Sequence, residues 1–397
     1  MIGRTAIPRH AYFVNLRDRA GDLIDQCLIL YFPAPYSFTG EDVIEIHCHG
    51  AQAVIEKIFS YLSEFGARMA EPGEFSRRAF YNNKMDLADV DGLAALLDAK
   101  TDAQRKAALR SLCGGDSTTY QSWRQDMLEI AAFAAAILDY ASDDLPENIG
   151  DTLRVRVEKL LRKIRGAISR YTAARAVRSG FNIAFAGRPN VGKSSLFNKI
   201  LGTNRAIVSD IAGTTRDVVD AEIDIDGYLV RLLDTAGLRD DATDAVEQIG
   251  IERTHDAMRD ADLILRVYDQ SSECKVQSAD NEIIIINKSD VYSGSRDAHA
   301  IHVSAKTGAG MDALMSVIRK KIHSILDTRE GDIAINARTR EQLSAAESEL
   351  SSALSAPDWD IFAEHTHRAA DSLGKILGTI TATEVLDATF GQLCLGK

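Results

Sequence analysis

The sequence predicts an α/β domain with a mostly parallel sheet, inserted into an all-α helical domain and preceded by a small α+β domain. Three observations carry this prediction. A phosphate-binding pattern joins a strand-like run to a helix-like run near residue 190, helical periodicity flanks that region on both sides, and short alternating apolar runs open the chain. We place the parts at residues 1–82, 83–178, 179–330 and 331–397, with the second and fourth forming one helical domain.

The beginning of the chain predicts a small sheet with one helix. Apolar and polar residues alternate over residues 11–16, 23–32 and 43–47, and the turn-forming residues 17–21 join the first two runs as a hairpin. Apolar positions then recur at helical spacing over residues 51–65. These elements are expected to form the α+β domain.

Helical periodicity dominates the regions before and after the α/β domain. It runs from Lys84 to about Arg178 and returns over residues 338–354, 361–373 and 381–386. Because these two regions flank one uninterrupted α/β pattern, we expect a single helical domain that the α/β domain interrupts.

A phosphate-binding loop is predicted at residues 187–194, whose letters G-R-P-N-V-G-K-S match the pattern G-x-x-x-x-G-K-S. Residues 181–186 read as a buried strand, and the residues after the loop read as an amphipathic helix. A loop in this position turns backbone N–H groups toward phosphate oxygens, and the helix N-terminus adds its dipole. Lys193 is expected to reach the β and γ phosphates, and the Ser194 hydroxyl to bind Mg²⁺.

Two motifs that would sense the γ-phosphate follow in the expected order. Residues 213–217 spell G-T-T-R-D, and Thr215 among them would complete the Mg²⁺ shell. The alternating run 229–233 leads into D-T-A-G. That places Asp234 at a strand end beside the metal-bound water, with the Gly237 N–H near the γ-phosphate.

Two further motifs indicate which base is bound. The apolar strand 283–286 leads into N-K-S-D, which ends at Asp290. A carboxylate there can accept two hydrogen bonds from guanine that adenine cannot supply, and the S-A-K of residues 304–306 would brace the base. The five motifs together predict a P-loop GTPase domain. The residues expected to contact GTP are Asn190, Val191, Gly192, Lys193, Ser194, Ser195, Ser209, Asp210, Ile211, Ala212, Gly213, Thr214, Thr215, Asp234, Thr235, Ala236, Gly237, Asn287, Lys288, Asp290, Ser304, Ala305 and Lys306.

The group that activates the attacking water is less evident from the motifs. Many GTPases place a glutamine directly after the D-x-x-G motif, where this chain has Leu238. Arg216 and Arg239 are either arginine fingers in cis or solvated switch-loop arginines. Glu247 is the nearest carboxylate that can swing toward a water, and it also fits a surface acid.

Composition excludes several classes of protein. A net charge of −12 argues against binding nucleic acid over the whole surface. No apolar run approaches the roughly 20 residues of a membrane helix, and the start of the chain lacks a secretory signal pattern. The five cysteines are scattered without a C-x-x-C pair, which predicts reduced thiols and a cytoplasmic protein.

One stretch of the chain is strongly basic. Nine lysines and arginines lie between Arg154 and Arg178, against the single acid Glu158. Apolar residues in the same stretch recur at helical spacing, so the basic side chains lie on the opposite face. That face is either simply solvated or a contact for an RNA backbone.

Taken together, the motifs resemble those of the MnmE (TrmE) family of tRNA-modification GTPases. The resemblance extends beyond the GTPase motifs to both flanks and covers nearly the whole chain. The segments that carry it are G-R-P-N-V-G-K-S-S-L at 187–196, I-A-G-T-T-R-D at 211–217, D-T-A-G-L-R at 234–239, I-G-I-E-R at 249–253, C-L-G-K at 394–397, S-F-T-G-E-D at 37–42 and P-G-E-F-S at 72–76.

The resemblance implies how GTP hydrolysis is activated. In this family a potassium ion occupies the place of an arginine finger, and its binding lets two GTPase domains meet as a dimer. The K⁺ ligands would be Asn190, Ser209, Ile211 and Thr214, while Glu247 would orient the water or act as the general base. The catalytic candidates are therefore Asn190, Thr215 and Glu247.

The resemblance also implies a modification reaction. Family members act with a partner protein, MnmG, on C5 of the wobble uridine of certain tRNAs, using a one-carbon unit from a folate such as 5-formyltetrahydrofolate. The folate contacts would be Glu45, Lys84 and Lys397, and Cys394 would take part in the modification. The alternative is a GTPase switch that serves as an RNA or ribosome assembly or regulatory factor, without modification chemistry.

Two features depart from the family pattern. The family's N-terminal domain begins with a glycine-rich strand that carries a folate-contacting arginine, and no counterpart precedes Tyr12. Either the start is misassigned or the chain is truncated, and whether this chain binds folate and dimerises through its N-terminal domain depends on which of the two holds. Only residues 270–282 separate two strands of the GTPase domain, so their crossover helix is expected to be very short or replaced by a loop.

Overall fold

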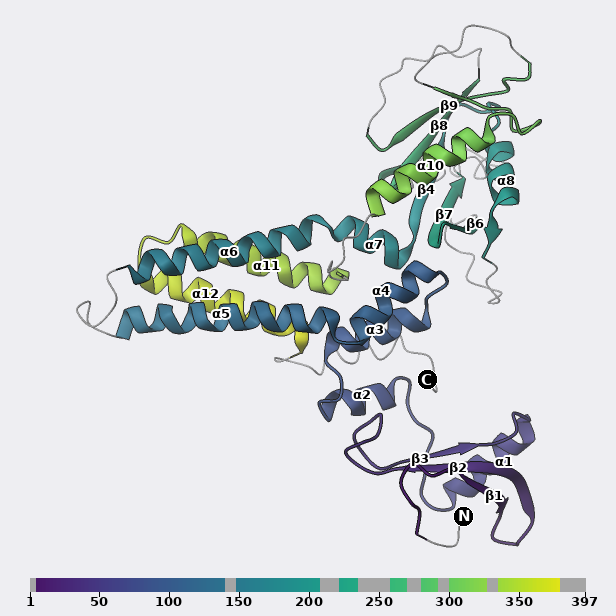
Figure 1. Ribbon diagram of the computed structural model, residues 1–397, viewed down its shortest axis with the longest axis vertical. Coiled ribbons are helices and arrows are strands. Elements are labelled where there is room, and N and C mark those ends of the chain that lie inside the picture. Colours follow the sequence, from purple (N-terminus) through teal and green to yellow (C-terminus); the bar gives the residue numbers. More distant parts are fainter. Residues whose placement is uncertain are drawn as a thin grey trace, which may run out of the picture.

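The computed structural model describes residues 5–139, 148–207, 221–234, 258–269, 280–291, 300–326 and 335–378. The predicted three-part architecture is confirmed (Figure 1). A small sheet domain lies at one end, a bundle of long helices lies in the middle, and an α/β domain lies at the other end. Among the described helices none is both long enough and apolar enough to cross a membrane.

The N-terminal domain is an antiparallel sheet with a helix on one face. Its strands are β1 (Tyr12–Arg17), β2 (Leu23–Phe32) and β3 (Val43–His47), in the order β1-β2-β3. The predicted hairpin joins β1 to β2. Helix α1 (Gln52–Ser63) packs its Ile58 against the buried face of the sheet, and α2 (Glu74–Tyr81) follows.

The opposite face of this sheet is open. Phe13 of β1 lies opposite Leu28 of β2, and both side chains are exposed. The neighbouring pair on that face joins Leu30 to Glu45 of β3. An apolar face with a carboxylate beside it is therefore left uncovered by this chain's own helix.

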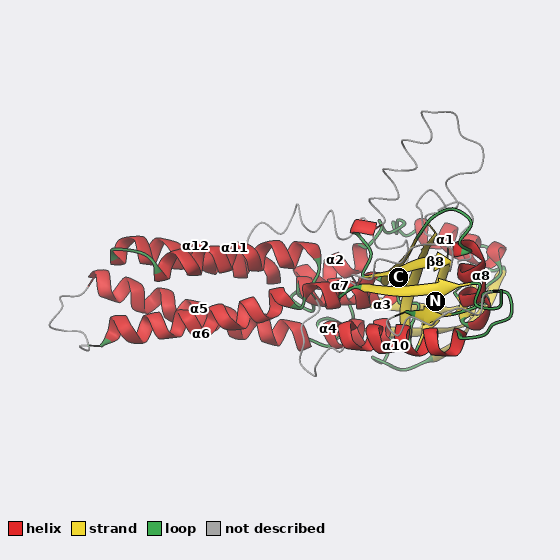
Figure 2. Cartoon of the chain, turned by 90° about the horizontal axis from the view of Figure 1, so that it is seen from above, coloured by secondary structure: helices red, strands yellow, loops and turns green. Residues whose placement is uncertain are grey.

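The helical domain is built from two separated parts of the chain, as predicted. Among the described helices, the long α5, α6, α11 and α12 run alongside one another, α4 and α7 adjoin the GTPase domain, and α3 packs against α4 (Figures 1 and 2). The helices are α3 (Leu87–Leu97), α4 (Asp102–Leu112), α5 (Gly115–Asp139), α6 (Ile149–Ser169), α7 (Tyr171–Ser179), α11 (Ala337–Leu354) and α12 (Trp359–Leu377).

Helix α6 shows why the long helices assemble. Its buried residues Leu153, Val157, Leu160, Leu161 and Ile164 follow the three- and four-residue spacing of one helix face, so they form a continuous apolar stripe. The stripe joins a core that includes residues of α5, α11 and α12. Burial of apolar side chains stabilises the bundle, at about 25 cal/mol per Å² of apolar surface.

Several basic side chains of α6 form ion pairs with neighbouring helices at the surface of the bundle. Arg156 pairs with Glu129 of α5 at 2.9 Å, and Lys163 pairs with Asp126 of the same helix at 2.8 Å. Toward α11, Arg165 pairs with Glu347 at 2.8 Å. Three of the nine basic residues of this stretch therefore pair with acidic neighbours of the same domain, while their side chains stay partly exposed. A solvated face and an RNA contact both stay predictions.

In its described residues the GTPase domain has a seven-stranded sheet in the order β10-β9-β8-β4-β7-β6-β5. The strands from β10 to β7 are parallel, and the hairpin of β6 and β7 begins the antiparallel edge. The elements are β4 (Phe181–Ala186), α8 (Lys193–Thr203), β5 (Arg205–Ala206), β6 (Ala221–Ile225), β7 (Tyr228–Asp234), β8 (Leu263–Asp269), β9 (Glu282–Asn287), β10 (Ile301–His302) and α10 (Met311–Leu326).

The predicted order of strands and motifs is found, but the short crossover cannot be compared with its prediction. Strands β8 and β9 are adjacent and parallel. Of the residues between them, 270–279 lie outside the described part of the chain. Helix α2 was not expected from the sequence, because its eight residues are too few to establish a helical period.

The hairpin of β6 and β7 rests on helix α4. The Ala103 backbone N–H donates to the Gly227 carbonyl at 3.1 Å, and the Lys100 ammonium donates to the Glu222 carboxylate at 2.6 Å. Within the helical domain, the Gln104 amide donates to the carbonyl of Arg178, near the end of α7, at 2.8 Å. The bonds of Ala103 and Lys100 join the GTPase domain to the helical domain.

The contact between α3 and α4 gives a prediction for Gly92→Ala. A Cβ at Gly92 would lie 2.5 Å from the backbone nitrogen of Leu112, so the two helices must separate. We expect a net loss of about 2 kcal/mol in the free energy of unfolding, measured by urea denaturation. Gly166→Ala on α6 is the matched control, because nothing lies within 4 Å of its Cβ, and it should gain about 0.5–1 kcal/mol. Equal stabilities of the two variants would contradict the packing argument.

Candidate nucleotide-binding site

The loop between β4 and α8 requires glycine at both fixed positions of its motif. Gly187 has φ 150°, and a Cβ there would lie 2.2 Å from the Val267 carbonyl oxygen. Gly192 has φ 95°, and its Cβ would lie 2.3 Å from the amide nitrogen of the buried Asn287. The loop therefore fits against β8 and β9 only without side chains at these positions.

The lysine of the motif lies across its own loop. Lys193 begins α8, is 7% exposed, and donates from Nζ to the carbonyls of Gly187 at 3.0 Å and Arg188 at 3.1 Å. The ammonium is thus held at the helix N-terminus, where the dipole and the loop N–H groups favour an anion. Ser194 and Ser195 follow in the first turn and are exposed.

Asn287 connects the loops that surround the site. It ends β9, is 2% exposed, and donates from Nδ2 to the Val191 carbonyl at 3.0 Å. Its Oδ1 accepts from the Ala305 backbone N–H at 3.1 Å. The next residue adds a second link, since Lys288 donates from Nζ to the Asn190 carbonyl at 2.7 Å. The phosphate loop and the loop after β10 are therefore both fixed to the end of β9.

Asp290 presents a charged carboxylate beside these loops. Its side chain is exposed, and one carboxylate oxygen accepts a 2.6 Å hydrogen bond from the hydroxyl of the fully buried Ser304. That hydrogen bond lowers the pKa of Asp290 below its ordinary value, because it favours the charged form. A fixed, ionised acceptor suits the paired N–H groups of a guanine edge.

The structure brings together the predicted base-binding and phosphate-binding residues that it describes. Asn190 to Ser195, Asn287, Lys288, Asp290 and Ser304 to Lys306 lie in the three connected loops. The backbone of Asp234 ends β7, paired to β4 beside the phosphate loop. The predicted residues outside the described part of the chain are Ser209, Asp210, Ile211, Ala212, Gly213, Thr214, Thr215, Arg216, Thr235, Ala236, Gly237, Leu238, Arg239, Glu247, Cys394 and Lys397.

The two described folate candidates lie in different parts of the N-terminal domain. Glu45 is on the open face of the sheet and accepts a 3.0 Å hydrogen bond from His47, two residues along β3. Lys84 follows α2, and a Cβ on Gly40 would lie 3.2 Å from its Cγ. The structure shows no direct contact between Glu45 and Lys84, both of which are described, exposed residues.

Sequence reasoning missed how the site is held together. The link from Asn287 to the phosphate loop joins residues 96 positions apart, and no local pattern indicates such a pairing. The S-A-K motif also did not indicate that the hydroxyl of the buried Ser304 donates to Asp290; its expected role of bracing the base stays a prediction. The strand-end location of both motifs is the signal that could have suggested these contacts, because neighbouring parallel strands end at one edge of a sheet.

Comparison with known proteins agrees with this geometry. One family model, the MnmE helical domain, matches residues 87–394, and another, the N-terminus of the GTP-binding protein TrmE, matches residues 2–84. The chain belongs to the MnmE family. The resemblance drawn from its motifs is thereby confirmed.

Relatives in this family match along nearly their whole length. The protein named tRNA modification GTPase MnmE of Paramagnetospirillum magneticum is 38% identical, over 98% of this chain and 91% of the relative. The protein of the same name from Brucella canis is 39% identical, over 98% and 90%. That of Rhizobium etli is 37% identical, over 100% and 92%.

A solved structure is also similar to part of the chain. The G domain of the T. maritima FeoB iron transporter is 24% identical, covers 36% of this chain and 98% of its own, and has a TM-score of 0.25. At this score the similarity supports no comparison of detail, and the MnmE assignment rests on the family models and relatives.

The hydrogen bond between Ser304 and Asp290 predicts a pH effect in Ser304→Ala. Without the hydroxyl the pKa of Asp290 should rise toward its ordinary value. Since the carboxylate is charged only above its pKa, the acidic limit of GTP binding should move to higher pH. Binding at neutral pH should weaken roughly threefold to tenfold through loss of the fixed orientation. Titration with a fluorescent GTP analogue at a series of pH values measures both effects. The series runs from about pH 3, below the ordinary Asp pKa of about 3.9, to about pH 8.

Ser289→Ala, in the same motif, is the matched control for this measurement. Its backbone N–H donates to the Val303 carbonyl and is unaffected by the change. An unchanged pH profile in Ser304→Ala would show that the buried hydroxyl does not set the charge of Asp290.

Proposed function

We propose that this chain is a potassium-activated GTP hydrolase that works with an MnmG-type partner to modify C5 of the wobble uridine of certain tRNAs. The observation that supports the GTP part most strongly is the ionised Asp290 carboxylate, fixed by Ser304. It lies in a loop that Asn287 and Lys288 connect to the phosphate loop. These hydrogen bonds link the loop proposed to recognise guanine with the loop proposed to bind the phosphates.

The described residues fit the ions that the proposal requires. The exposed Ser194 hydroxyl in the first turn of α8 is an oxygen donor of the kind Mg²⁺ prefers. Asn190 is exposed, has φ 63°, and offers an amide oxygen of the kind that replaces the hydration shell of K⁺. When bound, K⁺ supplies positive charge where negative charge develops between the β and γ phosphates.

This chain's own residues would then position the reactants. Lys193 holds the phosphates at the start of α8, and the Asn190 carbonyl is held in place by Lys288. We propose that Thr215 completes the Mg²⁺ shell and that Glu247 orients the attacking water. Ser209, Ile211 and Thr214 complete the K⁺ ligands in this proposal.

The open face of the N-terminal sheet supports a homodimer and a folate site. Phe13 and Leu28 form an exposed apolar surface, and Glu45 is adjacent on the same face. A second copy of this domain would cover the apolar residues, while Glu45, Lys84 and Lys397 would hold a folate such as 5-formyltetrahydrofolate. Sedimentation velocity tests the dimer, and a monomer at all concentrations would contradict it.

The tRNA enters the proposal through the relatives, and the partner protein enters it through the family resemblance alone. Their shared name is tRNA modification GTPase MnmE, and they match 98–100% of this chain. The alternative is a GTPase switch that serves as an RNA or ribosome assembly or regulatory factor without modification chemistry, and the shared name of the relatives favours modification over it. A role for Cys394 in the modification completes the proposal.

The potassium proposal predicts the ion dependence of Asn190→Ala. The wild-type chain should hydrolyse GTP about 10²-fold faster in KCl than in NaCl, because one ion supplies the missing positive charge. Asn190→Ala should be slow in both salts while its GDP affinity stays nearly unchanged. Asn198→Ala, an exposed asparagine of α8, is the matched control and should keep the K⁺ response. Equal wild-type rates in the two salts would contradict the potassium proposal and would favour Arg216 or Arg239 as an arginine finger in cis.

The modification proposal is tested in a strain that lacks its own homologue. Mass spectrometry of wobble uridines should show restored C5 modification with the wild-type chain. Asp290→Asn and Glu247→Ala should fail, the first through GTP binding and the second through turnover. Restoration by both variants would show that GTP hydrolysis is not required. If the wild-type chain hydrolyses GTP but does not restore the modification, the modification part of the proposal is wrong and only the GTPase part holds.

A further inference from the structure

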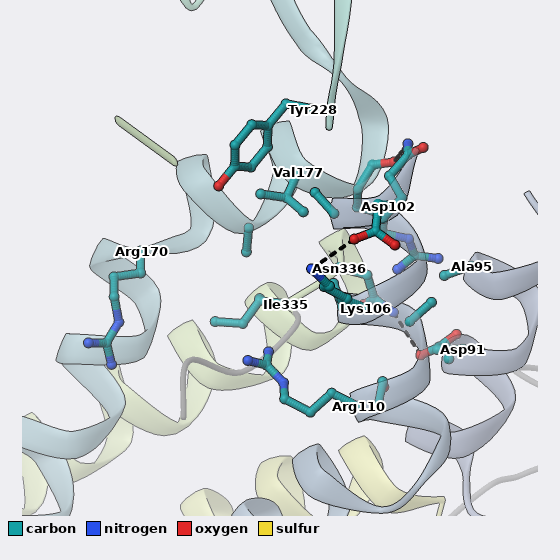
Figure 3. Close-up of a pocket in the computed structure, with 18 of the residues that line it drawn as sticks. Asp91, Ala95, Asp102, Lys106, Arg110, Arg170, Val177, Tyr228, Ile335 and Asn336 are labelled. Carbon is teal, nitrogen blue, oxygen red and sulfur yellow. Dashed lines mark hydrogen bonds and ion pairs between the residues drawn. The ribbon is translucent and has the colours of Figure 1, made fainter. Parts of the chain in front are cut away.

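A cavity of about 630 Å³ lies where the helical domain meets the GTPase domain. Helices α3 and α4 line one side, while α7, the turn between β6 and β7, and α10 line the other (Figure 3). None of the proposed GTP, metal or folate residues belongs to its described lining. Its volume is in the range of small-molecule sites, which are about 300–1,000 Å³.

Two buried donors of this cavity lack an acceptor among the described residues. The Tyr120 hydroxyl is one of them, and the whole residue is only 3% exposed. The other is Nε of Arg110, which lies 3.8 Å from the nearer Asp116 oxygen, beyond hydrogen-bond distance. Burial raises the pKa of Tyr120 well above its ordinary value, so the hydroxyl keeps its proton and remains a donor.

The acidic side chains that line the cavity form ion pairs or hydrogen bonds with neighbouring side chains. Their negative charge is therefore largely compensated and repels a bound anion little. The pairs are Asp91 with Arg338 at 2.7 Å, Asp102 with Lys106 at 2.8 Å, and Asp226 with His323 at 3.1 Å.

Positive charge and apolar surface complete the lining. Figure 3 shows Arg110 extending its guanidinium group toward Ile335, with Arg170 on the neighbouring wall. Val177 and the ring of Tyr228 add apolar surface between the two domains. The combination suits a ligand with an anionic end and a flat apolar body.

We propose that this cavity is a second ligand site, for a small molecule that carries a phosphate group on a flat apolar body. The phosphate oxygens would accept from Tyr120 and Arg110, and the apolar body would lie against Val177, Tyr228 and Ile335. A single water could satisfy one donor, but its share of liquid volume is about 30 Å³ and would leave most of the cavity empty. An occupant would contact both domains at once.

Isothermal titration calorimetry of the full chain tests the site with phenyl phosphate as the probe. The protein is first saturated with GDP, so that the phosphate loop is occupied and contributes no heat. We expect saturable 1:1 binding of phenyl phosphate, weaker binding of inorganic phosphate, and weaker binding of phenol. Absence of saturable binding, or phenol binding as tightly as phenyl phosphate, would overturn the proposal.

Two variants locate the binding. Tyr120→Phe removes only the hydroxyl and Arg110→Gln removes the charge, and each should weaken phenyl phosphate about tenfold. Arg156→Gln is the matched control, because this arginine pairs with Glu129 on the outside of the bundle. Unchanged affinity in Tyr120→Phe, the more conservative variant, would overturn the assignment even if Arg110→Gln does not fold. GTP hydrolysis by Tyr120→Phe reports separately on the proposed function.

Discussion

The nucleotide site depends on the side-chain amide of Asn287. Two hydrogen bonds, one given to the phosphate loop and one accepted from the loop after β10, unite segments that the chain brings from three different strands. The amide is 2% exposed, so leaving either bond unmade would cost about 1–3 kcal/mol. The same side chain lies where a Cβ on Gly192 would have to fit, which makes the shape of the phosphate loop and the position of Asn287 mutually dependent.

The fold and the centre of the site could be predicted because their signals are local. A motif with fixed glycines between a buried strand and a helix specifies its own backbone, and Asp290 follows its strand directly. The long helices could be predicted equally well, because apolar stripes such as that of α6 repeat over many helical turns. These features need only the residues within one element and its flanks.

Contacts between distant segments could not be predicted in the same way. The pairing of Arg165 with Glu347 joins two helices that the inserted domain separates in sequence, and composition alone left that basic face undecided. Tyr120 and Arg110 carry no motif, and each is unremarkable in its own helix. Their importance arises from missing acceptors, which exist only once the surrounding helices and the GTPase domain are packed.

The hairpin of β6 and β7 links the GTPase domain to the helical domain. It lies in sequence between the G-T-T-R-D and D-T-A-G motifs, and it is bonded to Ala103 of α4 and to Lys100 just before that helix. Ala103 and Ala107 of the same helix also pack against the apolar core of the GTPase domain. The segment that separates the two γ-phosphate motifs in sequence is therefore in direct contact with the helical domain.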